Sequence, residues 1–469
     1  MTTAVVVGSG PNGLAAALTL AAEGVQVRVI EAADTLGGGT RSAELTLPGL
    51  VHDECAGFHP LALASAFADR FDLAGAGLTW RWAEAEMAHP LDGGRGAVVR
   101  RSVAETAAGL GAAGRTWTRI FGPLTERFDT ISEEILQPVL HVPRHPFHLA
   151  RFGLYSGIPA SLLARRFPTP EAQALFGGVA AHSFRELSSV ASSAIGVALT
   201  TAAHAYGWPV AEGGSVAIRD AVLTRARQHG VTFETGRRVS SLDELGNPDL
   251  VMLDTTPGAA VGIIGDRLPG RVRRAYARYR HGPGAFKVDF AVEGGVPWTH
   301  EGSRVAGTVH VGGDLAEIAA AERDIVAGRM PERPYLLVGQ QYLADPTRSV
   351  GDVHPLYAYA HVPAGYTGDA TEAIIQRIEQ FAPGFRDRIR ATYVRSTTAM
   401  SEHNENYVGG DIVTGANDPL QLAFRPRVAL NPYATGVKGV HLCSAATPPG
   451  AGAHGMCGYN AATRALARL

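Results

Sequence analysis

Three glycines near the start of the chain are spaced as a phosphate-binding turn requires. In "AVVVGSGPNGLAAALTLAAEGVQVRVIEAA", Gly8, Gly10 and Gly13 follow a continuous apolar run, and Glu31 ends the next strand-like run. The first glycine permits a tight turn, the second lets the backbone approach a pyrophosphate, and the third lets a helix pack closely on a strand. A carboxylate about 20 residues later accepts ribose hydroxyl hydrogens and repels a 2′-phosphate. The pattern predicts a site for FAD or NAD, which also includes Pro11, Asn12 and Ala32.

The next stretch distinguishes the two dinucleotides. "LGGGTRSAELTLPGLVHDECAGFHP" resembles the second phosphate-contacting motif of large flavoproteins, with Gly38, Gly39, Thr40 and Arg41 as cofactor contacts. The commonest form of that motif has arginine directly after the glycine pair, whereas Gly39 stands there in this chain. A solvated side chain is therefore the alternative for Arg41. An NAD dehydrogenase would continue with another regular α/β unit, which this stretch does not offer, so FAD is favoured.

The closing segment "TPPGAGAHGMCGYNAA" combines glycines with His454 and Cys457. Taken alone, it suits a metal loop, a catalytic cysteine or a turn before a last helix. The chain has no CxxC or HExxH pattern, so no metal site is predicted. A cysteine one turn into a helix is expected to pack as a small apolar residue rather than to act as a nucleophile.

Composition excludes several classes of protein. The chain has 469 residues, 46% of them hydrophobic, and a net charge of -2. That balance leaves no basic surplus for a nucleic-acid partner. Three cysteines form no disulfide framework, and no stretch has the roughly 18 consecutive apolar residues of a membrane span. We expect a cytoplasmic protein whose length corresponds to two to four domains.

The pattern of elements predicts an α/β fold with two domains. Residues 61–205 look mainly helical, "GVTFETGRRV" reads as a pair of strands in a hairpin, and "PDLVMLDTTP" reads as a buried strand. Strand-like runs alternate from about 283 to 400 with one amphipathic helix, "DATEAIIQRIEQFAPG". We predict a discontinuous Rossmann-like FAD-binding domain from 1–65, 206–265 and 400–469. The substrate domain, a mixed sheet with helices, would comprise 66–205 and 266–399.

The motifs together resemble the phytoene desaturase-like, or phytoene dehydrogenase-related, FAD-dependent oxidoreductases, whose fold is of the amine-oxidase flavoprotein type. The resemblance spans nearly the whole chain. It rests on "GSGPNGLAAALTLA", "GGGTRSAELTLPG", "GWPVAEGGS", "MLDTTP", "HGPGAFKVD", "NYVGGDI", "AFRP" and "VHLCSAATPPGAGAHGMCGYNAA". The resemblance implies oxidation of C–C or C–N single bonds, and some relatives isomerise double bonds with reduced flavin.

The same resemblance extends the candidate site. It places the segment that begins near His454 under the flavin ring, where the free N–H groups of a helix start would stabilise the reduced anion. The further cofactor residues that it implies are Val239, Thr255, Ser444, Gly455 and Met456. His454, Lys287 and His59 are the catalytic candidates. For His454 the alternative is a loop histidine satisfied by the backbone, and for Lys287 a lysine that reaches outwards.

These observations predict an FAD oxidoreductase that removes hydride from an apolar, polyene-like small molecule. The alternatives are a flavin-dependent isomerase without net redox change and a non-catalytic flavin-binding protein. Residues 144–167 mix arginines with apolar side chains and suggest peripheral membrane contact. Their prolines and glycine interrupt an amphipathic helix, however, and favour the lining of a substrate channel or plain helix packing. A dimer is compatible with the sequence, which leaves the oligomeric state open.

Overall fold

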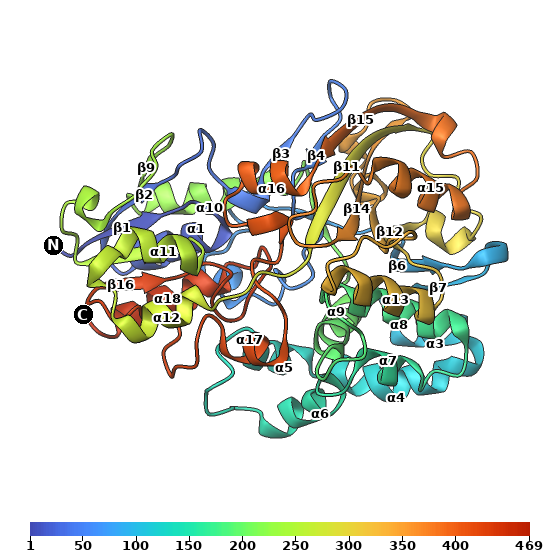
Figure 1. The fold of residues 1–469 in the computed structure, drawn as a ribbon, viewed down its shortest axis with the longest axis horizontal. Coiled ribbons are helices and arrows are strands. Elements are labelled where there is room, and N and C mark those ends of the chain that lie inside the picture. Colours follow the sequence, from blue (N-terminus) through green and yellow to red (C-terminus); the bar gives the residue numbers. More distant parts are fainter.

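The computed structural model describes residues 1–469 and contains two large sheets, one at each end of the molecule (Figure 1), and two small two-stranded ones. The first sheet is parallel and has the strand order β16-β10-β1-β2-β9. Its strands are β1 (Thr3–Val7), β2 (Gln26–Ile30), β9 (Thr232–Glu234), β10 (Leu250–Leu253) and β16 (Val440–Leu442). All five lie in the segments predicted to form the FAD-binding domain.

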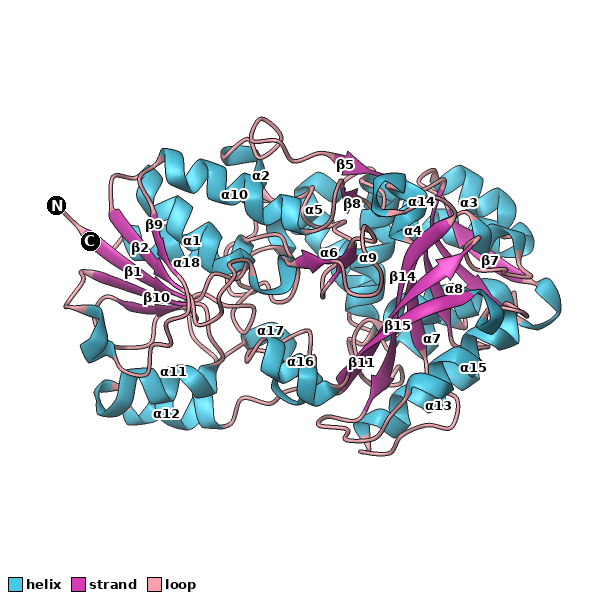
Figure 2. Ribbon diagram, turned by 90° about the horizontal axis from the view of Figure 1, so that it is seen from above, coloured by secondary structure: helices cyan, strands magenta, loops and turns pink.

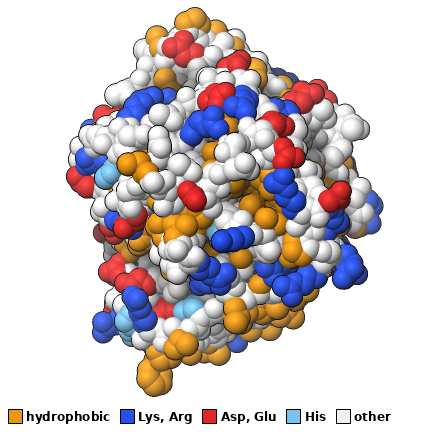
Figure 3. Space-filling view, turned by 90° about the vertical axis from the view of Figure 1, so that its left-hand side faces the viewer, with side chains coloured by type: hydrophobic (Ala, Val, Ile, Leu, Met, Phe, Trp, Pro, Cys, Tyr) orange, Lys and Arg blue, Asp and Glu red, His pale blue; other side chains and the backbone are white.

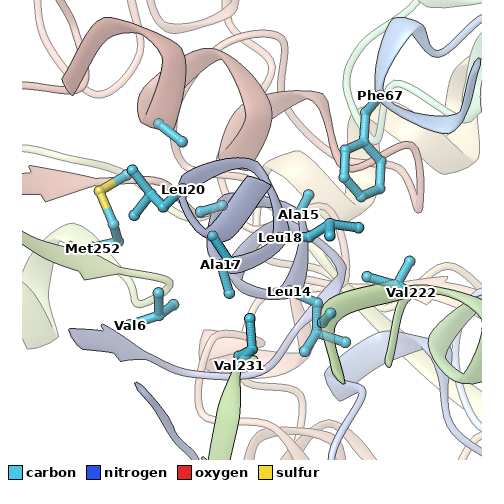
Figure 4. Close-up of a cluster of buried hydrophobic side chains, with 14 of the residues drawn as sticks. Val6, Leu14, Ala15, Ala17, Leu18, Leu20, Phe67, Val222, Val231 and Met252 are labelled. Carbon is cyan, nitrogen blue, oxygen red and sulfur yellow. The ribbon is translucent and has the colours of Figure 1, made fainter. Parts of the chain in front are cut away.

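Helices cover both faces of this sheet because its strands are apolar on both sides. Val6 of β1 packs toward one group of helices, and Val5 packs toward the other. The first group is α1 (Pro11–Ala22), α10 (Val216–Gln228) and α18 (Met456–Leu466), and the second is α11 (Pro257–Ile264) and α12 (Gly270–Ala277). Figure 4 shows α1 at the centre of the first core, enclosed by side chains from both sheet and helices.

The second sheet has seven strands in the order β15-β11-β14-β13-β12-β6-β7 and is antiparallel except where β12 meets β6. Its strands are β6 (Ala85–Pro90), β7 (Gly96–Val99), β11 (Gly284–Glu293), β12 (Ala306–Val311), β13 (Leu336–Gly339), β14 (Val353–Val362) and β15 (Ile389–Arg395). One face packs on α15 (Thr371–Phe381), the helix predicted from its periodicity.

A block of helices lies beside this sheet (Figure 1). It comprises α3 (Val103–Gly109), α4 (Gly114–Thr125), α5 (Phe128–Ile135), α6 (Pro146–Ser156), α7 (Ala160–Ala164), α8 (Pro170–Ala181), α9 (Ser193–Ala205) and α13 (Leu315–Val326). Short connecting elements complete the fold: β3 (Ser42–Ala43), β4 (His52–Asp53), α2 (Ala66–Arg70), β5 (Trp80–Arg81), β8 (Val210–Ala211), α14 (Gln341–Ala344), α16 (Thr397–His403) and α17 (Pro419–Phe424).

One prediction about elements was confirmed and one was wrong. Residues 61–205 are mainly helical, although β5, β6 and β7 also lie there and two of them join the seven-stranded sheet. "GVTFETGRRV" forms no hairpin: only Thr232–Glu234 is a strand, and it pairs in parallel with β2. Gly236, with φ of 69°, turns the chain away before a second strand begins.

Candidate functional site

The strands of the five-stranded sheet converge on the middle of the molecule, where loops from both halves meet (Figure 2). A cavity of about 460 Å³ lies there, beside the carboxyl ends of β1, β2 and β10. Ligands of open α/β sheets bind outside these strand ends. The predicted cofactor residues that line this cavity are Gly8, Gly10, Glu31, Ala32, Gly38, Arg41, Val239 and Thr255.

The glycine loop has no room for side chains. Gly8 has φ of 96°, and a Cβ there would lie 2.8 Å from the carbonyl oxygen of Asp254. A Cβ on Gly13 would lie 2.2 Å from the carbonyl oxygen of Gly8. These approaches allow the loop to turn tightly into α1, which begins beside the cavity. The side-chain oxygen of Asn12, buried at the start of α1, has no hydrogen-bond partner.

Glu31 is fixed at the wall of the larger cavity. Its Oε2 accepts hydrogen bonds from the backbone N–H and the hydroxyl of Ser9 at 2.8 and 2.6 Å, and its Oε1 accepts from the N–H of Ala33 at 2.9 Å. These bonds hold the carboxylate at the end of β2, in the position that a ribose-binding acid requires.

Arg41 connects the second motif to a distant segment. Its Nε donates to the carbonyl oxygen of Gly38 at 3.0 Å, and its Nη2 donates to that of His403 at 2.8 Å. The side chain is 9% exposed and lines the larger cavity. The solvated alternative is therefore wrong, and the guanidinium lies where it can neutralise a phosphate.

A second cavity of about 110 Å³ lies next to the first, and four residues line both: Gly10, Asp254, Asn404 and Asn406. Of the predicted cofactor residues, it is lined by Gly10, Pro11, Asn12, Gly39, Thr40 and Ser444. Cys55, Tyr407 and the backbone of 451–453 complete its wall. The two cavities therefore adjoin each other, the larger one beside the acid of β2 and the smaller one, the inner cavity, beside the C-terminal loop.

The C-terminal helix packs directly on the first helix. α18 begins at Met456, within the predicted range, and follows Gly455 with φ of 70°. A Cβ on Gly458 would lie 1.8 Å from the carbonyl oxygen of Asn12, so only glycine fits at this contact. Gly455 lines a small cavity of about 20 Å³ beside Pro11 and Thr40, whereas Met456 lines none of the three cavities.

His454 and Cys457 both have structural partners. The Nδ1 of His454 accepts the N–H of Met456 at 3.1 Å, and burial lowers the pKa of this histidine to about 4. The ring, which also lines the small cavity, is therefore neutral and caps α18, and it uses the first of the free N–H groups expected to face the flavin. Burial raises the pKa of Cys457 to about 12, so this thiol is no nucleophile near neutral pH.

The other two catalytic candidates lie in different surroundings. Lys287 is 2% exposed, so it faces the interior: its Nζ lies 2.5 Å from Asp289 and 5.0 Å from the centre of the Tyr357 ring. His59 hydrogen-bonds the hydroxyl of Ser215 at 2.9 Å and lines none of the three cavities. Lys287 also lines none of the three cavities and is paired with Asp289, and the contacts of His59 are structural.

Sequence reasoning missed Asp254, which lies at the centre of the site. It follows β10, lines both large cavities, and accepts the N–H of Gly13 on Oδ2 at 2.9 Å. Burial raises its pKa to about 7, and the charge of Glu31 adds to this effect. The signal was present in "VMLDTTP", because an acid at the carboxyl end of a buried parallel strand lies at the ligand edge of such a sheet.

Comparison with known proteins is consistent with this geometry. Residues 6–71 match the family model "NAD(P)-binding Rossmann-like domain". The chain is 28% identical over 442 residues to the phytoene dehydrogenase of Streptomyces griseus, an alignment that covers 83% of this chain and 78% of that protein. The fold is similar to that of an oxidoreductase from Methanosarcina mazei (TM-score 0.63, 13% identity, 98% and 100% coverage). It is also similar to that of putrescine oxidase (TM-score 0.62, 18% identity, 100% and 98% coverage).

The fold and the site define a protein of the Rossmann-like dinucleotide-binding class, with a second domain built on the seven-stranded sheet. Within that class, the similarity of this chain to the phytoene desaturase-like FAD oxidoreductases is confirmed by the relative that spans most of its length and by the amine-oxidase fold.

Proposed function

We propose that the protein binds FAD and removes hydride from a C–C or C–N bond of a small, largely apolar substrate. The observation that carries the proposal is the site formed by two adjoining cavities between Glu31 and the 451–453 loop. It has a ribose-binding acid at one end, glycine backbone and α1 in the middle, and residues of both chain ends at the other. When bound, FAD would supply the hydride acceptor.

The residues present fit this cofactor. Glu31 would accept the ribose hydroxyls, and the backbone of Val239 would lie beside the adenine. The glycine loop, the start of α1 and Arg41 would hold the pyrophosphate. Gly39, Thr40 and Ser444 line the inner cavity, where the flavin ring would lie. Lys287 would place a positive charge on the substrate side, paired with Asp289 when the substrate is absent.

Anaerobic bleaching of the purified flavoprotein tests the proposal. We expect the flavin absorbance to disappear when a polyene or amine substrate is added without oxygen, and to return when oxygen or a quinone is admitted. An isomerase would convert its substrate without bleaching and would need flavin reduced beforehand. A non-catalytic protein would hold FAD and show neither response. A purified protein with no affinity for FAD would refute the proposal entirely.

Asp254 should make FAD binding depend on pH. The pyrophosphate is negatively charged, so a carboxylate beside it gains a proton on binding. Since the pKa of Asp254 is about 7 before binding, affinity should be constant below that value and fall above it, by up to about tenfold per pH unit. Fluorescence titration of the apoprotein between about pH 6 and about pH 9 measures the slope. Asp254→Asn should abolish it, whereas Asp220→Asn, on the exposed face of α10, should not.

The proposed partner is a small molecule in the cytoplasm rather than a nucleic acid. The face in Figure 3 intersperses acidic and basic side chains, which supports this assignment. No helix of the structure has the length and apolar character needed to cross a membrane. Peripheral membrane contact stays a prediction, supported by the exposure of Val142, Phe147 and Leu154 in and near α6 at 91, 87 and 66%.

A further inference from the structure

The two faces of the seven-stranded sheet differ in chemistry although both are buried. The face under α15 is apolar, as in Val288 and Ala358. The opposite face carries Lys287 and Asp289 on β11, and Tyr357, Tyr359 and His361 on β14. These five side chains are at most 8% exposed. A sheet face that served only as core would be apolar, because burying polar groups costs free energy unless they are paired.

One pair on the polar face is left half satisfied. Nδ1 of His361 lies 2.6 Å from Oε1 of Glu322, which α13 contributes. The side chains of Glu322 and His361 are 0 and 1% exposed, yet Oε2 of the glutamate and Nε2 of the histidine have no hydrogen-bond partner. Each such buried atom is unfavourable, because it has lost its hydrogen bonds to water without gaining others. Two free polar atoms in one buried pair indicate that another group supplies the missing bonds.

Aromatic rings enclose this pair. The ring of Phe184 stacks on His361 with centroids 3.8 Å apart, and the rings of Tyr335 and Tyr359 lie 4.7 and 5.8 Å from it. Phe184 has φ of 51°, a left-handed conformation that bulky residues rarely adopt. Backbone strain of this kind is found mainly at ligand sites, where surrounding structure maintains it.

The pair is connected to the proposed flavin site by apolar contacts. Phe184, Tyr357 and Tyr359 belong to one buried cluster, against which Ile412 packs. Ile412 also lines the inner cavity, next to Cys55 and Tyr407. In the register of the sheet, His361 lies opposite Ala285, two positions along β11 from Lys287. The Glu322–His361 pair thus lies at the end of a run of buried aromatic side chains that begins at the inner cavity.

We propose that Glu322 and His361 bind a hydrogen-bond-donating head group of the substrate, a hydroxyl or a protonated amine. The apolar body of the substrate would lie along the tyrosines toward the flavin. Oε2 of an ionised Glu322 can only accept hydrogen bonds, so the head group must be a donor. This inference rests on the proposed function, and it makes the substrate amphipathic rather than wholly apolar.

Calorimetric titration with three probes tests the inference on the purified, FAD-loaded protein. The probes are hexylamine, 1-hexanol and 1-methoxyhexane, which share an apolar chain and differ in whether the head group can donate. We expect at least one donor probe to bind about tenfold or more tightly than the ether. The tighter of the two donors identifies the head group. Equal binding of all three probes to the wild-type protein would overturn the inference.

Two variants identify the pair as the cause of the preference. Glu322→Gln and His361→Gln should each bring the affinity for the donor probe down to that for the ether, while Asp324→Asn, two residues along α13, should change neither. A donor preference that persists in folded Glu322→Gln protein would mean that the pair holds only a buried water, and would refute the inference. Calorimetry involves no turnover, so the result is independent of whether any substrate bleaches the flavin.

Discussion

Replacing Gly458 by alanine is expected to abolish flavin retention. A Cβ at this position would lie 1.8 Å from the carbonyl oxygen of Asn12 and 2.9 Å from the amide nitrogen of Ala16. Both atoms belong to the backbone of α1, so no rotamer change relieves the clash, and the two helices must separate. Because Asn12 lines the inner cavity, the separation would displace the wall on which the flavin ring is proposed to lie. We expect flavin affinity to fall by about 100-fold, together with a loss of about 1–3 kcal/mol in the free energy of unfolding.

The ratio of flavin to protein absorbance after gel filtration measures retention, and urea denaturation measures stability. Gly153→Ala is the matched control, since Gly153 is inside α6 and a Cβ there would meet no atom within 4 Å. That change should raise stability by about 0.5–1 kcal/mol, because alanine favours the helix, and should leave flavin content unchanged. Wild-type flavin content in Gly458→Ala would show that the α1–α18 contact does not shape the site.

Replacing Arg348 by methionine should cause the largest loss of stability in the chain. Its Nη1 lies 2.6 Å from Asp53, its Nε lies 3.0 Å from Asp345, and its Nη2 donates to the carbonyl oxygen of Ala211 at 2.6 Å. All three charged side chains are at most 1% exposed. Arg348 lies in the segment between β13 and β14. Its guanidinium therefore links that segment to β4, through Asp53, and to β8, through Ala211. Removing it leaves two buried carboxylates without a counter-ion, at a cost of about 3–5 kcal/mol.

The loss should depend on pH in a defined direction. Burial alone would raise the pKa of Asp53, but the charge of Arg348 and the N–H of Ser215 lower it below its usual value. Without Arg348 the pKa of Asp53 must rise, so the variant takes up a proton and recovers part of its stability as the pH falls from about 7 to about 5. Urea denaturation at both pH values measures this recovery. Arg329→Met removes the surface pair with Asp324 and should cost less than about 1 kcal/mol; an equally small effect of Arg348→Met would contradict the prediction.

The elements that sequence predicted well are those whose local pattern and burial agree. Val5 and Val6 form a strand buried on both faces, and Gly8 to Gly13 turn it into α1 as the spacing required. The start of α18 at Met456 and the helix Thr371–Phe381 likewise follow from glycine placement and apolar periodicity. The backbone around the two cavities was therefore largely predictable from sequence, because glycines determine its geometry.

The parts that sequence did not predict depend on partners far along the chain. β6, "AEMAHP", is fully buried, but its polar residues Glu86 and His89 do not suggest a buried strand in the sequence. Their partners, the N–H of Trp208 and the carbonyl of Gly313, are more than 100 residues away. Glu322 and His361 meet only because α13 packs beside β14. No periodicity in the local sequence identifies such pairs of distant residues.

The contact between α1 and α18 also has a consequence for biosynthesis. The ribosome makes the glycine loop well before α18, yet α18 forms part of the core around α1 and touches the loop's own helix through Gly458. Until α18 has been synthesised, the side of α1 that it covers is exposed to solvent. The cavities beside the glycine loop therefore take their final shape only when α18 has packed on α1, and we expect the proposed cofactor to be retained only after that step.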